Sequence, residues 1–207
     1  GESRLHLVQV KFVKKLEQKG YKVRTFRQKE KAAQYLQEQF HNDTIGFGDS
    51  QTLLHMGLYA LLSKNNIVYD PNQFDDNDNF LKTAKKALTA KYFLTSVNAI
   101  TEDGIIINMD GTGNRVAGSL FGHEKVFFIF GTNKIVSNIE EGVWRTRNIA
   151  APQNAKRIGC NTPCALKGDR CYDCNSPYRI CSGLLIQYKK MNDSDAEIII
   201  IDEDLGF

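Results

Sequence analysis

The sequence lacks the features that mark several large classes of protein. None of its apolar runs approaches the length of a membrane span, and no signal peptide is visible near the N-terminus. It contains no HExxH, Walker or Ser-His-Asp pattern, so these motifs assign no catalytic residue, and the catalytic residues are unknown from sequence. We expect a cytoplasmic protein without a membrane-spanning segment.

The few histidines form no constellation. His55 lies in an apolar helical stretch, His123 follows a glycine, and His6 and His41 flank predicted helices. Each is expected to be structural or exposed rather than catalytic.

Cysteine is absent outside residues 160–181, where all five cysteines lie. An odd number of cysteines in a chain without a visible signal peptide argues against a secreted disulfide framework. The same region is basic, with nine Lys and Arg against two Asp and Glu over residues 145–190. We interpret this charge as compensation for thiolates rather than as a nucleic-acid surface, because Tyr172 and Tyr178 are too few for interleaved aromatics.

The remaining composition is that of a globular protein. With 207 residues, 42% apolar and 25% charged, the chain is long enough for one well-buried domain. No internal repeat or low-complexity linker divides it. We therefore expect a single α/β domain over residues 1–207, including a Cys-rich irregular segment over residues 158–183.

Hydrophobic periodicity predicts strands that alternate with helices. This order is typical of an α/β fold with a mostly parallel sheet flanked by helices. In the first helix, Leu5, Val8, Phe12 and Leu16 should face inward. We expect the last two strands to pair as an antiparallel hairpin. The predicted helices cover residues 4–18, 28–40, 53–62, 80–90 and 137–151, the last ending at Pro152, and the predicted strands cover residues 21–26, 44–47, 67–69, 91–97, 105–107, 126–130, 184–188 and 198–201.

Glycine-containing loops follow three of the predicted strands. They are Gly46–Ser50, which runs into a helix that Asp49 or Ser50 can cap, Asp110–Arg115, and Gly131–Lys134. Glycine permits positive φ and close backbone approach to a ligand, and ligands bind at the carboxyl edge of open α/β sheets. We therefore predict one shared pocket for a phosphate or carboxylate. The alternative is that these glycines only make tight turns.

Two cations next to these loops are candidates for the anion-binding charge. Arg115 or Lys134 is predicted to bind the carboxylate or phosphate, and an arginine can do so with two hydrogen bonds. The alternative for Arg115 is an ion pair with Asp110 or Glu102.

The cysteines follow the pattern C-x3-C-x6-C-x2-C-x6-C. Two of them form a C-x2-C pair, and two others lie symmetrically six residues outside it, so we predict that this quartet binds one metal centre. Zinc and an iron–sulfur cluster both accept four thiolates, and free or redox-paired thiols are the other alternative. Cys160 is left out of the quartet, which comprises Cys164, Cys171, Cys174 and Cys181.

Taken together, five segments resemble the lactate-utilisation (LUD) domain family. They are GFGDSQTL (Gly46–Leu53), GTGNR (Gly111–Arg115), FGTNKIV (Phe130–Val136), RNIAAPQNAKR (Arg147–Arg157) and TPCALKGDRCYDCNSPYRIC (Thr162–Cys181), the last resembling the cysteine-bearing branch of that family. The resemblance implies the fold of ribose-5-phosphate isomerase, glucosamine-6-phosphate deaminase and CoA transferases. It also implies a ligand pocket formed by Gly46, Gly48, Asp49, Ser50, Gly111, Gly113, Asn114, Arg115, Asn133 and Lys134.

The resemblance implies a link to iron–sulfur-dependent oxidation of L-lactate to pyruvate. The first functional hypothesis is therefore a component of a lactate-oxidising system that binds a small anionic metabolite, with possible partner subunits. The second is a non-catalytic metal-binding or redox-sensing module. No glutamate matches the catalytic position of CoA transferases, which argues against transferase chemistry.

Overall fold

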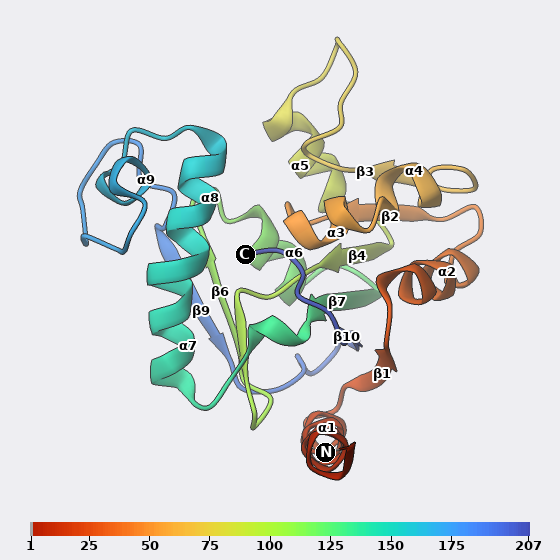
Figure 1. Ribbon diagram of the computed structural model, residues 1–207. Coiled ribbons are helices and arrows are strands. Elements are labelled where there is room, and N and C mark those ends of the chain that lie inside the picture. The colour runs from red at the N-terminus through yellow and green to blue at the C-terminus, as the bar shows by residue number, and fades with distance from the viewer. Residues whose placement is uncertain (1) are drawn as a thin grey trace.

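The computed structural model describes residues 2–207, and the side chains of residues 9–207. The predicted inward positions Leu5 and Val8, and also His6, lie outside the described side chains. Two β-sheets form the centre of the molecule (Figure 1). Among the described residues, no helix combines the length and the apolar character needed to cross a membrane.

The first sheet has six strands, and all of its pairings are parallel. At the carboxyl ends of four of these strands, the following segments approach the site described below. In spatial order the strands are β1 (Lys22–Phe26), β10 (Asp195–Ile201), β7 (Lys125–Gly131), β4 (Tyr92–Thr95), β2 (Thr44–Phe47) and β3 (Ile67–Tyr69).

The second sheet has four strands and is mixed. Its middle strands form an antiparallel hairpin, whose turn follows Thr101 and includes Gly104 at φ +86°. The spatial order is β8 (Ile135–Val136), β5 (Ala99–Thr101), β6 (Ile106–Asp110) and β9 (Gly183–Gln187), with β5 and β8 parallel and the other pairs antiparallel.

Helices cover the outer faces of both sheets. Each predicted helix is present, although the boundaries shift by a few residues and Gly57, at φ +64°, divides one of them in two. The helices are α1 (Glu2–Gln18), α2 (Lys29–Gln39), α3 (Gln51–His55), α4 (Leu58–Leu62), α5 (Phe80–Ala87), α6 (Asn114–Leu120), α7 (Ile139–Arg145), α8 (Ala151–Ile158) and α9 (Pro163–Lys167), with a 3₁₀ turn at Thr132–Lys134 and a π-helical turn at Thr146–Ala150.

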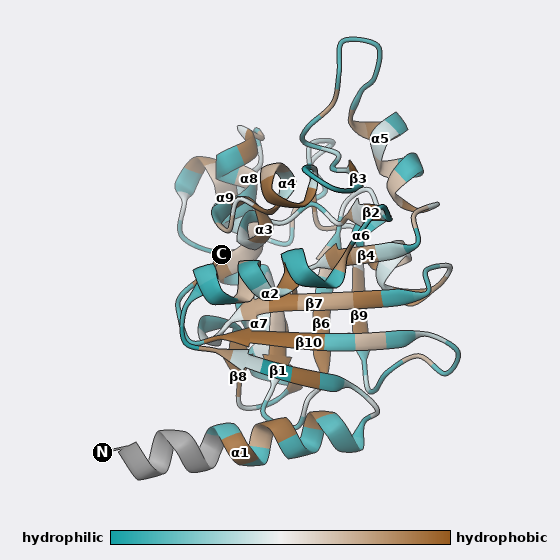
Figure 2. Cartoon of the chain, turned by 90° about the vertical axis from the view of Figure 1, so that its right-hand side faces the viewer, coloured by the Kyte–Doolittle hydropathy of each residue, from teal (hydrophilic) through white to brown (hydrophobic). Residues whose placement is uncertain are grey.

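Alternating side chains of the central strands build two cores on opposite faces of the first sheet. Ile199 and Phe127 face a core shared with α2, α3 and α4, whereas Ile198 and Phe128 face a core shared with α1 and the second sheet. The period of two along a strand accounts for this division. Figure 2 shows the hydrophobic residues concentrated in β7 and β10, and Phe12 and Leu16 of α1 are buried as predicted.

The second sheet packs between the first sheet and α7. Ile107 and Val136 of the second sheet contact Ile139 and Val143 of the helix. In Figure 1, α7 and α8 therefore lie on the far side of β6 and β9 from the six-stranded sheet. The fold is the predicted α/β class with a mostly parallel sheet flanked by helices.

The predicted pairing of the last two strands is wrong. β10 lies between β1 and β7 in the first sheet, and β9 pairs with β6 in the second. The apolar run of β10 is buried on both faces, which suits the middle of a parallel sheet.

The predicted helix stop at Pro152 is also wrong, because the helical path continues through α8. Proline removes one backbone N–H and crowds the carbonyl group four residues earlier. Here the preceding turn is π-helical, and the N–H of Ala151 donates to the carbonyl oxygen of Thr146, five residues back. This wider turn accommodates the proline.

Candidate functional site

A cavity of about 580 Å³ opens where the carboxyl ends of the first-sheet strands face the second sheet. Loops after β2, β4, β6 and β7, residues of α8 and residues 179–181 and 206–207 surround it. Because the strands of the first sheet are parallel, the loops at their carboxyl ends meet at this edge.

One wall is the turn between β2 and α3. Ser50 begins α3 by accepting a hydrogen bond from the N–H of Leu53 (3.4 Å) on its Oγ. A Cβ at Gly48 would lie 2.6 Å from Thr95 Oγ1 and 2.8 Å from Arg115 Cγ, so only glycine fits here. Since α3 spans five residues, its dipole adds little to anion binding.

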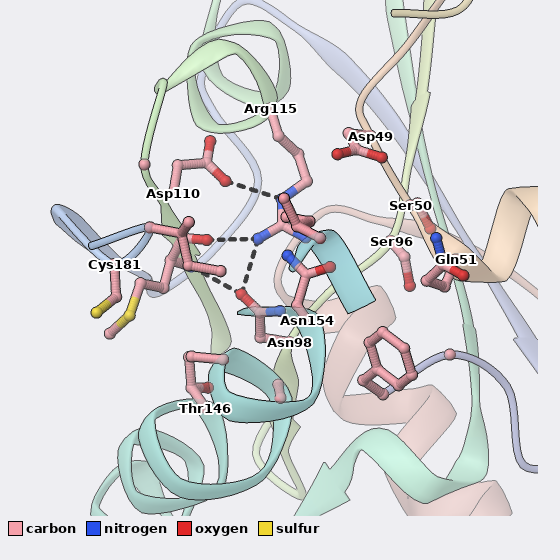
Figure 3. A pocket seen from close by; sticks show the side chains of 18 of the residues that line it. Asp49, Ser50, Gln51, Ser96, Asn98, Asp110, Arg115, Thr146, Asn154 and Cys181 are labelled. Carbon is pink, nitrogen blue, oxygen red and sulfur yellow. Dashed lines mark hydrogen bonds and ion pairs between the residues drawn. The ribbon is translucent and has the colours of Figure 1, made fainter. Parts of the chain in front are cut away.

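Arg115 lies beside this turn and is held by three groups (Figure 3). Its Nε pairs with Asp110 Oδ1 at 3.1 Å, and its Nη2 donates to Asn98 Oδ1 (2.8 Å) and to the carbonyl oxygen of Met109 (2.7 Å). The predicted alternative, an ion pair with Asp110, is therefore present. Both side chains of this pair are nearly buried, with 12% and 10% exposed.

Lys134 lies deeper in the cavity and is 3% exposed. Burial, reinforced by the positive charges of Arg145 and Arg115, lowers the pKa of Lys134 to about 7. Burial also lowers the pKa of Arg145, which donates from Nη1 to backbone oxygens of Asn98 and Phe207, each at 3.0 Å.

Another wall consists of α8 and the end of the Cys-rich segment. Asn154 and Arg157 lie three residues apart on α8, and both line the cavity. The cysteine segment approaches so closely that a Cβ at Gly111 would lie 2.6 Å from the carbonyl oxygen of Ile180. The N–H of Ser182 fixes this approach by donating to the carbonyl oxygen of Asp110 (2.9 Å).

The cavity lining is more cationic than anionic. Its cations are Arg115, Lys134, Arg157 and Arg179, and its carboxylates are Asp49 and Asp110. The Asp110 carboxylate is already used by Arg115. The arrangement therefore favours an anion that carries a carboxylate or phosphate group.

The structure brings most of the predicted ligand residues together. Asp49, Ser50, Gly111, Asn114, Arg115 and Lys134 line the one cavity, whereas Gly46, Gly48, Gly113 and Asn133 do not. Their roles in ligand binding stay predictions.

The four that do not line the cavity have other tasks in the structure. A Cβ at Gly46 would lie 2.2 Å from the carbonyl oxygen of Ala87 in α5. Gly113 adopts φ +86° where α6 begins. Asn133 exchanges hydrogen bonds with the backbone of Leu205.

Sequence reasoning missed Ser96, Asn98, Arg145, Asn154 and Arg157. Ser96 and Asn98 follow the carboxyl end of β4. The predicted strand ran on to residue 97. Had it ended at Thr95, the expectation that ligands bind after the carboxyl ends of strands would have pointed to both residues. Helical spacing would have placed Asn154 and Arg157 on one face, had the helix not been ended at Pro152. Nothing in the sequence indicates that Arg145 meets Phe207.

The thiols of the Cys-rich segment have ligand chemistry that suits zinc or an iron–sulfur cluster. As the side chains are placed, however, no three His, Cys, Asp or Glu residues in the described part of the chain form a group able to hold a metal ion. All five cysteines are free and half-buried. This placement does not fit a metal centre, and the quartet Cys164, Cys171, Cys174 and Cys181 stays a prediction.

Two comparisons with known proteins bear on this geometry. A sequence model of the LUD domain matches residues 10–201, nearly the whole chain. The chain belongs to the LUD domain family. This family is associated in general with lactate utilisation, and the match agrees with the resemblance seen in the motifs that line the cavity.

The fold of this LUD domain protein is similar to that of a solved structure. The crystal structure of a DUF162 family protein from Deinococcus radiodurans superposes with a TM-score of 0.51 and 13% sequence identity, covering 95% of this chain and 97% of that one. At this identity the likeness concerns the fold alone. No curated protein matches the chain.

Proposed function

We propose that this LUD domain protein binds a small anionic metabolite in the cavity, as a component of a lactate-utilisation system. The observation that carries the proposal is the convergence of Arg115, Lys134, Arg157 and Arg179 on one cavity that holds two carboxylates. The family association makes L-lactate and pyruvate the first ligands to test. Inorganic phosphate is the third probe, because the cationic lining suits a phosphate group as well as a carboxylate.

Arg157 is the cation best placed to reach an incoming anion at the cavity entrance. Its side chain is exposed, and its two side-chain hydrogen bonds (2.8 and 3.0 Å) both go to Asn154 in its own helix. Within the described part of the chain, it forms no ion pair with a carboxylate. The guanidinium can therefore bind a carboxylate or phosphate without breaking another ion pair.

Isothermal titration calorimetry with L-lactate, pyruvate and inorganic phosphate tests the proposal. We expect at least one probe to bind, and Arg157→Ala to weaken its affinity about tenfold, the loss of one charge-assisted hydrogen bond. Arg24→Ala is the matched control, because Arg24 lies on edge strand β1 and packs over the ring of Tyr35, 4.7 Å from its centre. Absence of binding by all three probes would refute the proposal.

A second candidate function is a redox-sensing or metal-binding module. The specific observation is that Cys181 and its neighbours Arg179 and Ile180 form part of the cavity wall. A change in the thiol, by oxidation or by metal binding, would then alter the shape of the cavity. In this case the affinity for the probes should differ between reduced and oxidised protein, and Cys181→Ser should abolish that difference.

A further inference from the structure

A smaller cavity of about 230 Å³, the side lobe, adjoins the main cavity and has no part in the function proposed above. The two cavities share four lining residues, which are Ser50, Gln51, Asn72 and Arg157. Figure 3 labels two of these, Ser50 and Gln51, from the side of the main cavity. Because Arg157 lines both cavities, an anion that it binds lies at the boundary between them.

The lining of the side lobe combines apolar side chains with one carboxylate. Its apolar residues are Phe47 and Leu53, which are buried, and Leu54, which is exposed. Among the described residues that line the lobe, the carboxylate is that of Asp70. Gly48, one of the residues predicted to bind the ligand, also lines it. This lining suits an aliphatic chain that ends in a hydrogen-bond donor.

Asp70 is held at the carboxyl end of an edge strand. It follows β3, which pairs in parallel with β2, so it lies at the same edge of the sheet as the glycine loop after β2. The N–H of Gln73 closes a turn after Asp70 by donating to its carbonyl oxygen (2.9 Å), with Pro71 at the second position. The N–H of Asn72 donates to Asp70 Oδ1 (3.0 Å), and the side chain of Asn72 donates to Asp49 Oδ1. The turn thereby fixes the Asp70 carboxylate beside the lobe.

The Asp70 carboxylate lacks a cation. In the part of the chain that the structure describes, neither Asp70 nor its neighbour Asp49 forms an ion pair, although Arg157 lines the same lobe. Burial raises the pKa of Asp70, and the charge of Asp49 acts in the same direction. An ammonium group would compensate this negative charge, whereas a hydroxyl group offers a hydrogen bond without charge. The lobe therefore favours an amine.

We propose that the side lobe is a second subsite of the cavity, in which Asp70 binds an ammonium group of the ligand while Arg157 binds its carboxylate or phosphate. The inference rests on the proposed function, from which it takes the role of Arg157. It adds a substrate class: small zwitterions with an anionic group at one end and an amine at the other. The apolar residues of the lobe would contact the aliphatic chain between the two charges.

Calorimetry with matched pairs of probes is the first test. β-Alanine, γ-aminobutyrate and δ-aminovalerate are compared with propionate, butyrate and valerate, which have the same chains without the amine. O-Phosphoethanolamine and ethyl phosphate form the corresponding phosphate pair. We expect at least one amine-bearing probe to bind at least tenfold more tightly than its partner, because its ammonium group forms charge-assisted hydrogen bonds with Asp70. The pair with the larger preference assigns the ligand to carboxylates or to phosphates.

The second test removes the charge of Asp70 and keeps its shape. Asp70→Asn still offers an oxygen to the N–H of Asn72, so the variant should fold. We expect it to lose the preference for the amine-bearing probe and to keep its affinity for the partner without the amine. Arg157→Ala should instead weaken both members of the pair, about tenfold. Asp76→Asn is the matched control, because Asp76 lies in the same loop, is exposed and lines neither cavity.

The outcomes separate this inference from the proposed function. If no probe binds, with or without an amine, the proposed function fails and the subsite fails with it. If L-lactate, pyruvate or phosphate binds but no amine-bearing probe binds more tightly than its partner, only the subsite is refuted. A preference that persists in Asp70→Asn, or that is also lost in Asp76→Asn, would refute the role of Asp70. Binding of amine-bearing probes alone would support the subsite and exclude L-lactate and pyruvate as the ligands.

Discussion

Arg115 donates from Nη2 to the side-chain oxygen of Asn98, and the backbone N–H of Met109 donates to the same oxygen, both at 2.8 Å. Asn98 precedes β5, Met109 lies in β6 and Arg115 lies in α6. One amide oxygen thus joins three segments that border the cavity. The ion pair between Arg115 and Asp110 completes the arrangement, so Arg115 holds this wall together as well as contributing charge to the cavity.

Arg115→Met should therefore destabilise the fold. It leaves the oxygens of Asp110, whose side chain is nearly buried, and of the half-buried Asn98 with one donor fewer. We therefore expect the free energy of unfolding to fall by about 1.5–3 kcal/mol in urea. Arg157→Met is the control and should change it by less than about 0.5 kcal/mol, because Arg157 bonds only Asn154 on an exposed helix surface. Equal losses in the two variants would show that Arg115 has no special structural role.

Much of the fold could be predicted from periodicity and apolar runs. Strands such as β7 and helices such as α2 have strong local signals, and their positions are confirmed. The pairing of strands could not be predicted in the same way, because β6 and β7 have similar apolar runs but belong to different sheets. The local sequence indicates that a strand is buried. The sheet to which the strand belongs depends on contacts between distant segments, such as β6 and β9.

The candidate site was predictable where it consists of loops at the ends of parallel strands. Ser50 and Asn114 come from separate loops, and they line one cavity. The contribution of Phe207 and Arg145 was not predictable, because their contact joins residues 62 positions apart without a sequence motif. The roles of the glycines were also ambiguous, since packing against a neighbour and approach to a ligand have the same sequence signature.

Gly46 tests that ambiguity directly. Since an added Cβ would lie 2.2 Å from the backbone oxygen of Ala87, Gly46→Ala should force α5 away from β2 and lower the free energy of unfolding by about 1–3 kcal/mol. Gly183→Ala is the matched control: an added Cβ there meets nothing within 4 Å, so stability should be unchanged or slightly raised. Full stability of Gly46→Ala with loss of anion binding would instead assign Gly46 to the ligand site.

The buried Lys134 should make the stability of the protein depend on pH. Its pKa is lowered to about 7, whereas an unfolded chain keeps the lysine protonated up to about pH 10.5. Between these values the unfolded state holds more protons, so the free energy of unfolding should rise with pH by up to about 1.4 kcal/mol per pH unit from this group. Urea unfolding of the wild type and Lys134→Met measures the difference. Parallel pH profiles of the two proteins would contradict the lowered pKa.

The same pKa predicts how anion binding responds to pH. A carboxylate or phosphate favours the protonated lysine, so its binding should weaken as the pH rises through about 7, where Lys134 loses its proton. The two charged groups that act on Lys134 are Arg145 and Arg115. Calorimetry in two buffers of different ionisation enthalpy should show proton uptake by the protein near this pH. Proton uptake that persists in Lys134→Met would assign the titration to another group.

The Cys-rich segment provides the last prediction. We expect protein purified without oxygen to contain one metal centre bound by Cys164, Cys171, Cys174 and Cys181, with a colourless zinc-containing sample or a coloured iron–sulfur one as the alternatives. As the side chains are placed, these thiols are not gathered into a metal-holding group, so binding requires the segment to rearrange. Segments with few apolar residues depend on such a crosslink for their shape. Slower hydrogen exchange over residues 168–182 on adding metal would report the rearrangement.

Serine substitutions decide which thiols take part. Each of the variants Cys164→Ser, Cys171→Ser, Cys174→Ser and Cys181→Ser should lose metal, measured by elemental analysis. Cys160→Ser is the matched control and should keep it. Retention of metal by Cys181→Ser together with its loss from Cys160→Ser would show that the quartet is wrong, and a metal-free wild type would refute metal binding altogether.

Metal binding by Cys181 should also affect the cavity, because Cys181 lines it. If Cys181 binds metal, adding metal should change the affinity for pyruvate or phosphate in the wild type but not in Cys181→Ser.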